Sequence, residues 1–155
     1  MSSVNVLLLA IQLATRQRDA AGKAVLLGHQ SRSNAQDQME QLESYAADTE
    51  AKWALASRAV SSAQMVRHYY QFMDRLQHAM ALQRNAMADL DQQLVAARKG
   101  LLEAEIRIAS LQQLLGKKQA GLLKVQAGRE QKQQDEFAAL QHRRLRTGPD
   151  TLGAA

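Results

Sequence analysis

The chain has 155 residues, a net charge of +5 at pH 7, few aromatic residues, a single Pro and no Cys. These features exclude disulfides, thiolate metal sites and cysteine nucleophiles, and they argue against sandwiches, barrels and other folds built from many tight turns. The chain is rich in Ala, Leu and Gln, which favour helices. The composition therefore predicts an all-α protein, and the lack of Cys fits a reducing compartment.

An apolar stretch lies near the N-terminus, from Val4 to Leu13. No Lys or Arg precedes it, and Asn5 and Gln12 interrupt it. A signal peptide would need a basic start and a small-residue cleavage site, and a membrane span would need a longer apolar run. We therefore expect neither.

The first predicted helix covers about residues 4–57. Apolar and small residues recur there at alternating steps of three and four, from Val4 to Ala56. A turn is expected at about residues 58–62, where the Ser-rich stretch contains Ser61, followed three residues later by Gln64. This spacing matches a capping box at the start of a second helix.

The second predicted helix covers about residues 62–145. Seventeen positions spaced by four and three residues from Tyr69 to Val125 are apolar, except for Gln83 and Lys118. An apolar stripe with a period of 3.5 residues stays in contact with a partner helix only when the two helices supercoil. The pattern therefore predicts a coiled coil.

An antiparallel register in which facing residue numbers sum to 122 places the two apolar stripes opposite each other. In this register Gly28 faces Leu94, and Trp53 faces Tyr69. Small residues meet large ones through the middle, which favours a hairpin within one chain over a parallel homodimer. The predicted fold is one domain, residues 1–155: a long antiparallel two-helix coiled-coil hairpin with a longer C-terminal helix and a disordered tail at 147–155.

The unequal helices leave residues 119–145 without a partner in the hairpin. Residues 116–146 contain eight Lys and Arg but only three Asp and Glu. Nucleic acid, an anionic membrane surface or an acidic protein surface would each attract such a segment. A solvated helix face is the alternative interpretation.

The sequence contains none of the motifs that enzymes of common classes require. It has no phosphate-binding loop of the Walker type and no nucleophile elbow, and its four His residues lack the spacing of metal ligands. We therefore expect no enzymatic activity, no cofactor and no metal site.

Two aromatic residues, Tyr45 and Phe72, lie beside the predicted seam and exceed what a two-helix coil needs. Near the same end of the hairpin, neighbouring positions on the two helices form two stripes, namely 38, 42, 45 and 49 and 72, 76, 79 and 83. These stripes either widen the core or form an apolar patch that binds a partner.

Three short motifs resemble the flagellar FliJ family. They are Gln38–Tyr45, Tyr70–Leu76 followed by Ala79, and Lys132–Ala138. The chain length, the turn near residue 60 and the longer second helix agree with this resemblance, which covers nearly the whole chain.

The resemblance implies a non-enzymatic stalk of the flagellar type III protein export apparatus. Members of the family form an antiparallel coiled coil, insert into the ring of the export ATPase FliI, contact the export-gate protein FlhA and have been linked to export chaperones. We accordingly expect a protein that is monomeric when isolated and binds no nucleic acid. Its expected location is cytoplasmic, peripheral at the inner face of the cell membrane near the flagellar base.

The resemblance also implies a gate-binding surface near the turn. In this sequence it comprises Gln38, Leu42, Tyr45, Phe72, Leu76, Ala79 and Gln83. Two positions depart from the family pattern, because Gln83 replaces a His found in some relatives and Thr49 replaces a usual Tyr. For the ATPase, the basic C-terminal part of the second helix supplies the expected contacts Lys132, Phe137, Arg143, Arg144 and Arg146.

Three other functions remain open at this point. The chain could be the stalk of a non-flagellar type III injectisome, a basic coiled-coil module that binds nucleic acid or an anionic membrane, or a structural homo-oligomeric coiled coil. Binding that falls steeply with salt and needs no protein partner would indicate the second.

Overall fold

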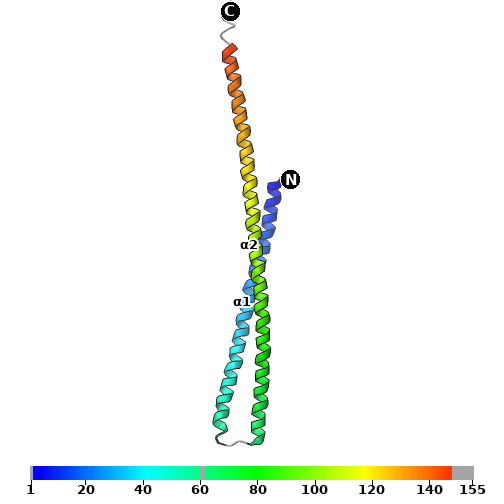
Figure 1. The fold of residues 1–155 in the computed structure, drawn as a ribbon, viewed down its shortest axis with the longest axis vertical. Helices are drawn as coiled ribbons and strands as arrows, with labels where there is room; N and C mark the ends of the chain where they lie inside the picture. Colours follow the sequence, from blue (N-terminus) through cyan, green and yellow to red (C-terminus); the bar gives the residue numbers. More distant parts are fainter. Residues whose placement is uncertain (1, 60–61, 148–155) are drawn as a thin grey trace, which may run out of the picture. The chain divides into compact units, whose positions relative to one another are not determined.

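The computed structural model describes residues 2–59 and 62–147. These residues form two helices and no strand: α1, Ser3–Ala56, and α2, Ala63–Thr147 (Figure 1). The helices are antiparallel and pack against each other, so the predicted all-α helical hairpin is confirmed.

The helix ends lie within two residues of the expected bounds. Ser62 caps α2, because its Oγ accepts a hydrogen bond from the backbone N–H of Met65 at 3.2 Å. The capping box was expected one residue earlier, at Ser61, which lies outside the described residues. The expected disordered tail also lies outside them, apart from Thr147, which is the last residue of α2.

Contacts between the helices divide the chain into two compact units. We call residues Ala14–Ile106 the turn unit, and Met1–Leu13 together with Arg107–Ala155 the terminal unit. Each helix contributes to both units. That residues 1–155 form a single domain stays a prediction.

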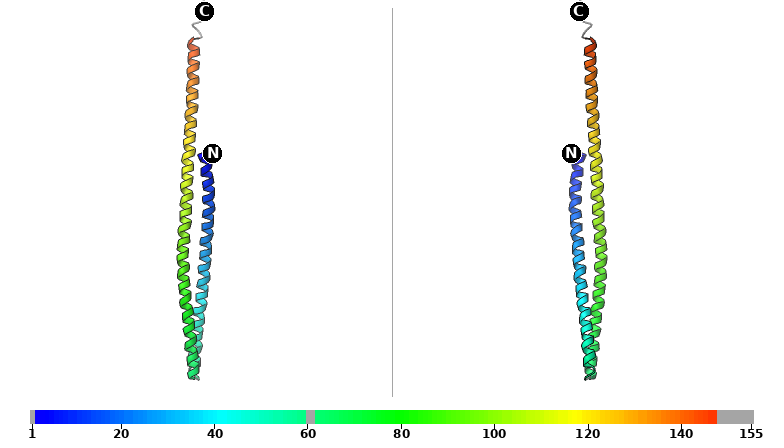
Figure 2. Two further views of the ribbon diagram at one scale, coloured as in Figure 1. Left: turned by 90° about the vertical axis from the view of Figure 1, so that its right-hand side faces the viewer. Right: turned by 90° about the vertical axis from the view of Figure 1, so that its left-hand side faces the viewer.

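The core of the turn unit follows the predicted seam. The two helical segments lie side by side in both views of Figure 2. The buried residues of this unit are Ala14, Ala35, Met39, Met73, Leu76 and Leu94. Each of them occupies a position of the 3.5-residue repeat, and burying one large apolar side chain contributes about 1.5–3 kcal/mol.

Two contacts confirm the predicted register. A Cβ built on Gly28 would lie 3.1 Å from Leu94 Cδ1. Near the turn, the rings of Trp53 and Tyr69 stack with centroids 4.5 Å apart and planes within 6° of parallel. In both pairs the residue numbers sum to 122, so Leu94 fills the space that the missing side chain of Gly28 leaves.

Two polar residues in the seam of the turn unit, Gln83 and Arg32, have partners on the other helix. The Gln83 side chain donates a hydrogen bond to the backbone carbonyl of Ala35 at 2.8 Å. Farther from the turn, the Arg32 guanidinium donates to Asp91 Oδ1 at 2.6 Å, which is a charge-assisted contact across the hairpin. These bonds explain why the seam of the turn unit tolerates Arg32 and Gln83.

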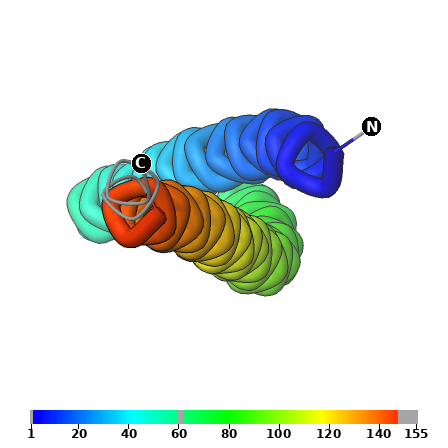
Figure 3. The backbone as a smooth tube through the Cα atoms, turned by 90° about the horizontal axis from the view of Figure 1, so that it is seen from above, coloured from blue at the N-terminus to red at the C-terminus, as the bar shows by residue number. Residues whose placement is uncertain are grey.

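In the terminal unit, Ile108 is buried and Leu7, Leu111 and Leu115 are half-buried. Every residue of α2 from 116 to 147 is exposed. Seen end-on, this part of α2 continues as an unbroken coil to the last described residue (Figure 3). The prediction that the second helix extends beyond its intrachain partner is therefore confirmed.

The helical glycines allow a test of the register. Gly100→Ala should raise the free energy of unfolding by about 1 kcal/mol, because Ala favours helix and nothing lies within 4 Å of the added Cβ. Gly28→Ala should gain clearly less, since Leu94 must move to admit the methyl group. Thermal melts of both variants measure the difference, and equal gains would contradict the Gly28–Leu94 contact.

Candidate partner-binding surfaces

The sequence-predicted gate residues come together on one side of the turn unit. Tyr45 on α1 and Phe72 on α2 are in edge-to-face contact, with ring centroids 5.6 Å apart and planes at 81°. Such a pair contributes about 0.5–1.5 kcal/mol beyond its buried area. We call the surface formed by Gln38, Leu42, Tyr45, Phe72, Leu76, Ala79 and Gln83 the turn-proximal patch.

A hydrogen bond fixes the far end of the patch. Gln83 Nε2 donates to Gln38 Oε1 at 3.1 Å, in addition to its bond with the Ala35 carbonyl. The Gln83 amide is thus held by two acceptors from α1. The other departure from the family pattern, Thr49, donates its hydroxyl hydrogen to the Tyr45 carbonyl at 2.8 Å within α1.

The members of the patch differ in what they offer to a partner. Tyr45 is 55% exposed, and Gln38 is also exposed, whereas Leu76 is only 7% exposed. The other four residues are half-buried. Phe72 therefore contributes to the core and also keeps part of its ring accessible beside Tyr45.

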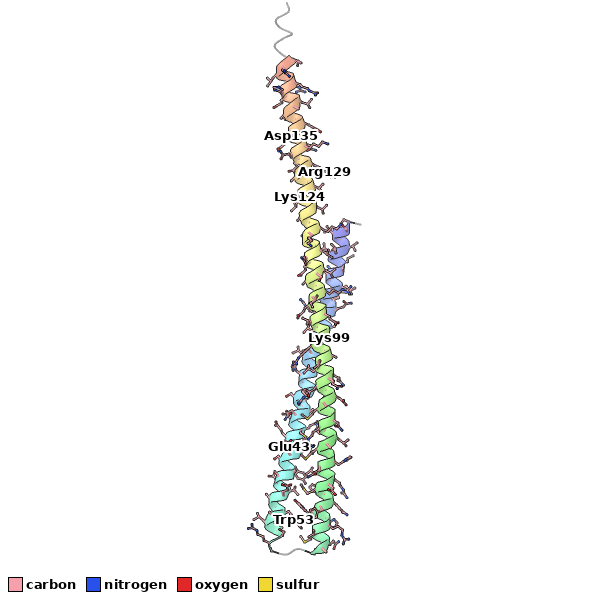
Figure 4. The ribbon with its side chains drawn as sticks, viewed as in Figure 1. Glu43, Trp53, Lys99, Lys124, Arg129 and Asp135 are labelled. Carbon is pink, nitrogen blue, oxygen red and sulfur yellow. The ribbon has the colours of Figure 1, made fainter. Side chains whose placement is uncertain are left out.

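An aromatic cluster closes the turn unit next to the patch. Tyr69 stacks on Trp53, which Figure 4 labels near the turn, and Tyr70 contacts Tyr69 edge to face. Burial, together with the negative charge of Glu50 and coupling to Tyr70, raises the pKa of the Tyr69 hydroxyl above its ordinary value of 10. The hydroxyl is therefore neutral at physiological pH.

The sequence-predicted ATPase contacts all lie on the exposed part of α2, residues 116–147, which we call the basic segment. Lys132, Arg143, Arg144 and Arg146 are exposed, and the Phe137 side chain is 63% exposed. Figure 4 shows Lys124, Arg129 and Asp135 along the same stretch. The segment thus presents positive charge and uncovered apolar side chains together.

A groove at the start of the basic segment was not among the sequence-predicted sites. It has a volume of about 480 Å³ and is lined by Ser3 of α1 and, on α2, by Leu114, Lys117, Lys118, Gly121, Leu122 and Val125. The apolar stripe of α2 continues to Val125, past the residues that face the start of α1. This continuation could have located the groove from the sequence.

The two sides of the turn unit also differ in a way that sequence reasoning missed. One side has two grooves that share Arg84 and are lined by the charged residues Arg32, Glu43, Glu50 and Asp91. The opposite side, which carries the turn-proximal patch, has a groove beside Gly28 lined by Ala24, Leu27, Ser31, Leu90, Gln93 and Ala97.

Residues 2–59 and 62–147 contain no group of three or more His, Asp or Glu that could hold a metal ion. Neither described helix has a stretch that is long and apolar enough to cross a lipid bilayer.

Comparison with protein families gave a match over most of the chain. The model of the family described as flagellar FliJ protein matches residues 6–147, which is nearly the whole chain. Comparisons with curated proteins and with solved structures gave no match.

Proposed function

Because the chain belongs to the flagellar FliJ family, which has a role in flagellar protein export, we propose that it is the non-enzymatic stalk of the export apparatus. In this role it couples the export ATPase, FliI, to the membrane export gate, FlhA, and assists export chaperones. The protein acts in the cytoplasm, at the inner face of the membrane near the flagellar base, and reaches the membrane through its partners.

The observation that carries this proposal is the presence of two surfaces of different chemistry on one helical hairpin. The turn unit presents the uncharged, aromatic turn-proximal patch, and the terminal unit presents the basic segment. The helix α2 contributes to both. A protein that connects two partners needs two such surfaces, and different chemistry keeps each partner from binding the wrong one.

The turn-proximal patch is the proposed site for the gate. Tyr45 is large and amphipathic, Phe72 is large and apolar, and the two rings contact each other across the hairpin. Aromatic residues of this kind dominate binding energy in protein interfaces. Leu76 is too buried to contribute much direct contact. It instead belongs to the buried seam beneath the patch.

The basic segment is the proposed site for the ATPase. Its charges would attract and orient an acidic surface on that partner, while Phe137, together with Leu122 and Val125, offers apolar area for docking. The basic segment buries none of its residues within the chain, and most helical stability in proteins comes from packing of one helix face. A partner that covers one face would therefore stabilise the helix as well as bind it.

Phe72→Ala tests the gate contact. We expect at least about a tenfold loss of affinity for the gate protein, reduced motility, and a melting temperature only slightly lowered, because part of the Phe72 ring is accessible. Phe137→Ala is the matched control, since it removes the same side chain from the basic segment. It should leave gate binding unchanged and weaken ATPase binding.

Affinity and melting must be measured on the same samples. Phe72 would belong to the core alone if Phe72→Ala lowered the free energy of unfolding by about 3–5 kcal/mol, as for a fully buried Phe, while the folded variant kept its affinity for the gate protein. Binding to the ATPase and gate proteins of an injectisome, rather than to those of the flagellum, would indicate the alternative stalk role. Salt-sensitive binding to nucleic acid or anionic vesicles without any protein partner would contradict the stalk role altogether.

A further inference from the structure

On the side of the turn unit that carries the turn-proximal patch, the positions that flank the seam are uncharged over residues 14–49 of α1 and 72–104 of α2, and the next flanking position on α1 is Lys52. Every seventh residue of α1 counted from Gly28 and from Ala24, within residues 14–49, is uncharged. The same holds on α2 for every seventh residue counted from Leu76 and from Phe72, within residues 72–104. We call this surface the uncharged face.

The flanking positions on the opposite side of the turn unit have a different composition. There the flanking positions include Glu43 and Glu50 on α1, and Arg84 and Asp91 on α2, with Arg32 paired to Asp91. Flanking positions of a coiled coil are ordinarily charged and solvated. The hairpin follows that rule on one side only.

The uncharged face also contains a groove, which lies farther from the turn than the turn-proximal patch does. The groove beside Gly28 has a volume of about 360 Å³, and Leu27 at its edge is 64% exposed. Its small residues Ala24 and Ala97 let another backbone approach closely. Depletion of charge with exposed apolar side chains is typical of the buried centre of a protein interface.

From these observations we infer that the export gate contacts the whole uncharged face, including the groove at Leu27 and Gln93, through a helix whose contact stripe is apolar and uncharged. This inference rests on the proposed function. The gate protein is the occupant because the groove continues the surface that begins at the turn-proximal patch. An acidic or anionic partner finds no positive charge at the flanking positions of residues 14–49 and 72–104, and a charged helix would leave its own charges unpaired there.

Two adjacent glutamines allow a matched test. Gln93 lines the groove, whereas Gln92 is exposed on the outside of α2. Gln→Glu is nearly isosteric and adds the same negative charge at either position. Likewise Leu27 lines the groove, and its neighbour Leu26, 70% exposed, does not. The pair L27E/Q93E and the control pair L26E/Q92E therefore have identical composition and net charge.

The experiment measures the affinity of each full-length variant for the detergent-purified gate protein. L27E/Q93E should lower that affinity by about tenfold or more, because two carboxylates become buried without partners. L26E/Q92E should change it by less than about twofold, as for charges at the rim. Q93E alone should give a smaller loss with an unchanged melting curve, which excludes unfolding as the cause.

The Phe72→Ala variant in the same assay separates this inference from the proposed function. If Phe72→Ala weakens binding and L27E/Q93E does not, the inference fails and the gate contact stands. Equal losses for the inner and outer pairs would show a general charge effect and also overturn the inference. A dimer of the isolated protein that Q93E alone dissociates, with gate affinity unchanged, would show that a second copy occupies the face.

Discussion

Leu94→Asp should collapse the hairpin. Leu94 is 6% exposed and lies against Gly28, where an Asp would be buried without a cationic partner, at a cost of several kcal/mol. Loss of the Leu side chain adds a cavity term. Circular dichroism should show reduced helicity at 25 °C and a melting temperature lower by more than about 10 °C.

The adjacent residue provides the control for this prediction. Val95 is 65% exposed, so Val95→Asp places the same charge on the outer surface of α2 and should change the melt only slightly. Similar melts for the two variants would show that the seam has been assigned to the wrong helix face.

Truncation after Lys118 should abolish most ATPase binding while leaving the hairpin intact. It removes the basic segment beyond that residue, including Leu122, Val125 and Phe137, all of which are exposed. Because no residue from 119 to 147 is even half-buried, the cooperative melt of the remaining hairpin should keep its midpoint. Affinity for the purified ATPase and stimulation of its ring assembly measure the effect.

Reversal of Arg143, Arg144 and Arg146 to Glu separates charge from apolar contact in the same segment. ATPase binding should weaken most at low salt, where screening is weakest. Replacement of the same three residues by Lys keeps the charge and should have little effect. Full ATPase activation by the truncated protein would mean that the basic segment is only a solvated helix end.

The register of the hairpin could be predicted from sequence because it depends on a long, simple pattern. Matching the small residues of α1 to the large residues of α2 allows few alignments, and only one brings Gly28 opposite Leu94 and Trp53 opposite Tyr69. The structure confirms both contacts. Near Lys118, α1 no longer covers the seam of α2, and this position followed from the difference in length between the two predicted helices.

The exposure of individual patch residues could not be predicted in the same way. Tyr45 and Phe72 occupy equivalent flanking positions, yet Tyr45 is exposed and Phe72 is half-buried. This difference depends on how each ring rotates against its neighbours, and the repeat does not contain that information. The bonds of Gln83 to Ala35 and Gln38 likewise depend on side-chain geometry across the hairpin.

The uncharged face, by contrast, was readable from the sequence. It required only that the positions flanking the seam be compared between the two sides of the coil, once the register placed Gly28 and Leu94 opposite each other. The pattern of apolar residues alone does not reveal this face, because Gln38, Gln83 and Gln93 are polar yet uncharged.

The central claim is that one molecule of this protein connects the export ATPase to the gate. The most direct measurement is retention of the purified ATPase on immobilised gate protein, with and without the full-length chain. The account predicts retention only when the chain is present, with loss on Phe72→Ala and, independently, on truncation after Lys118. Equal retention of the ATPase without the chain, or bridging by both variants as efficient as by the unmodified protein, would contradict the account.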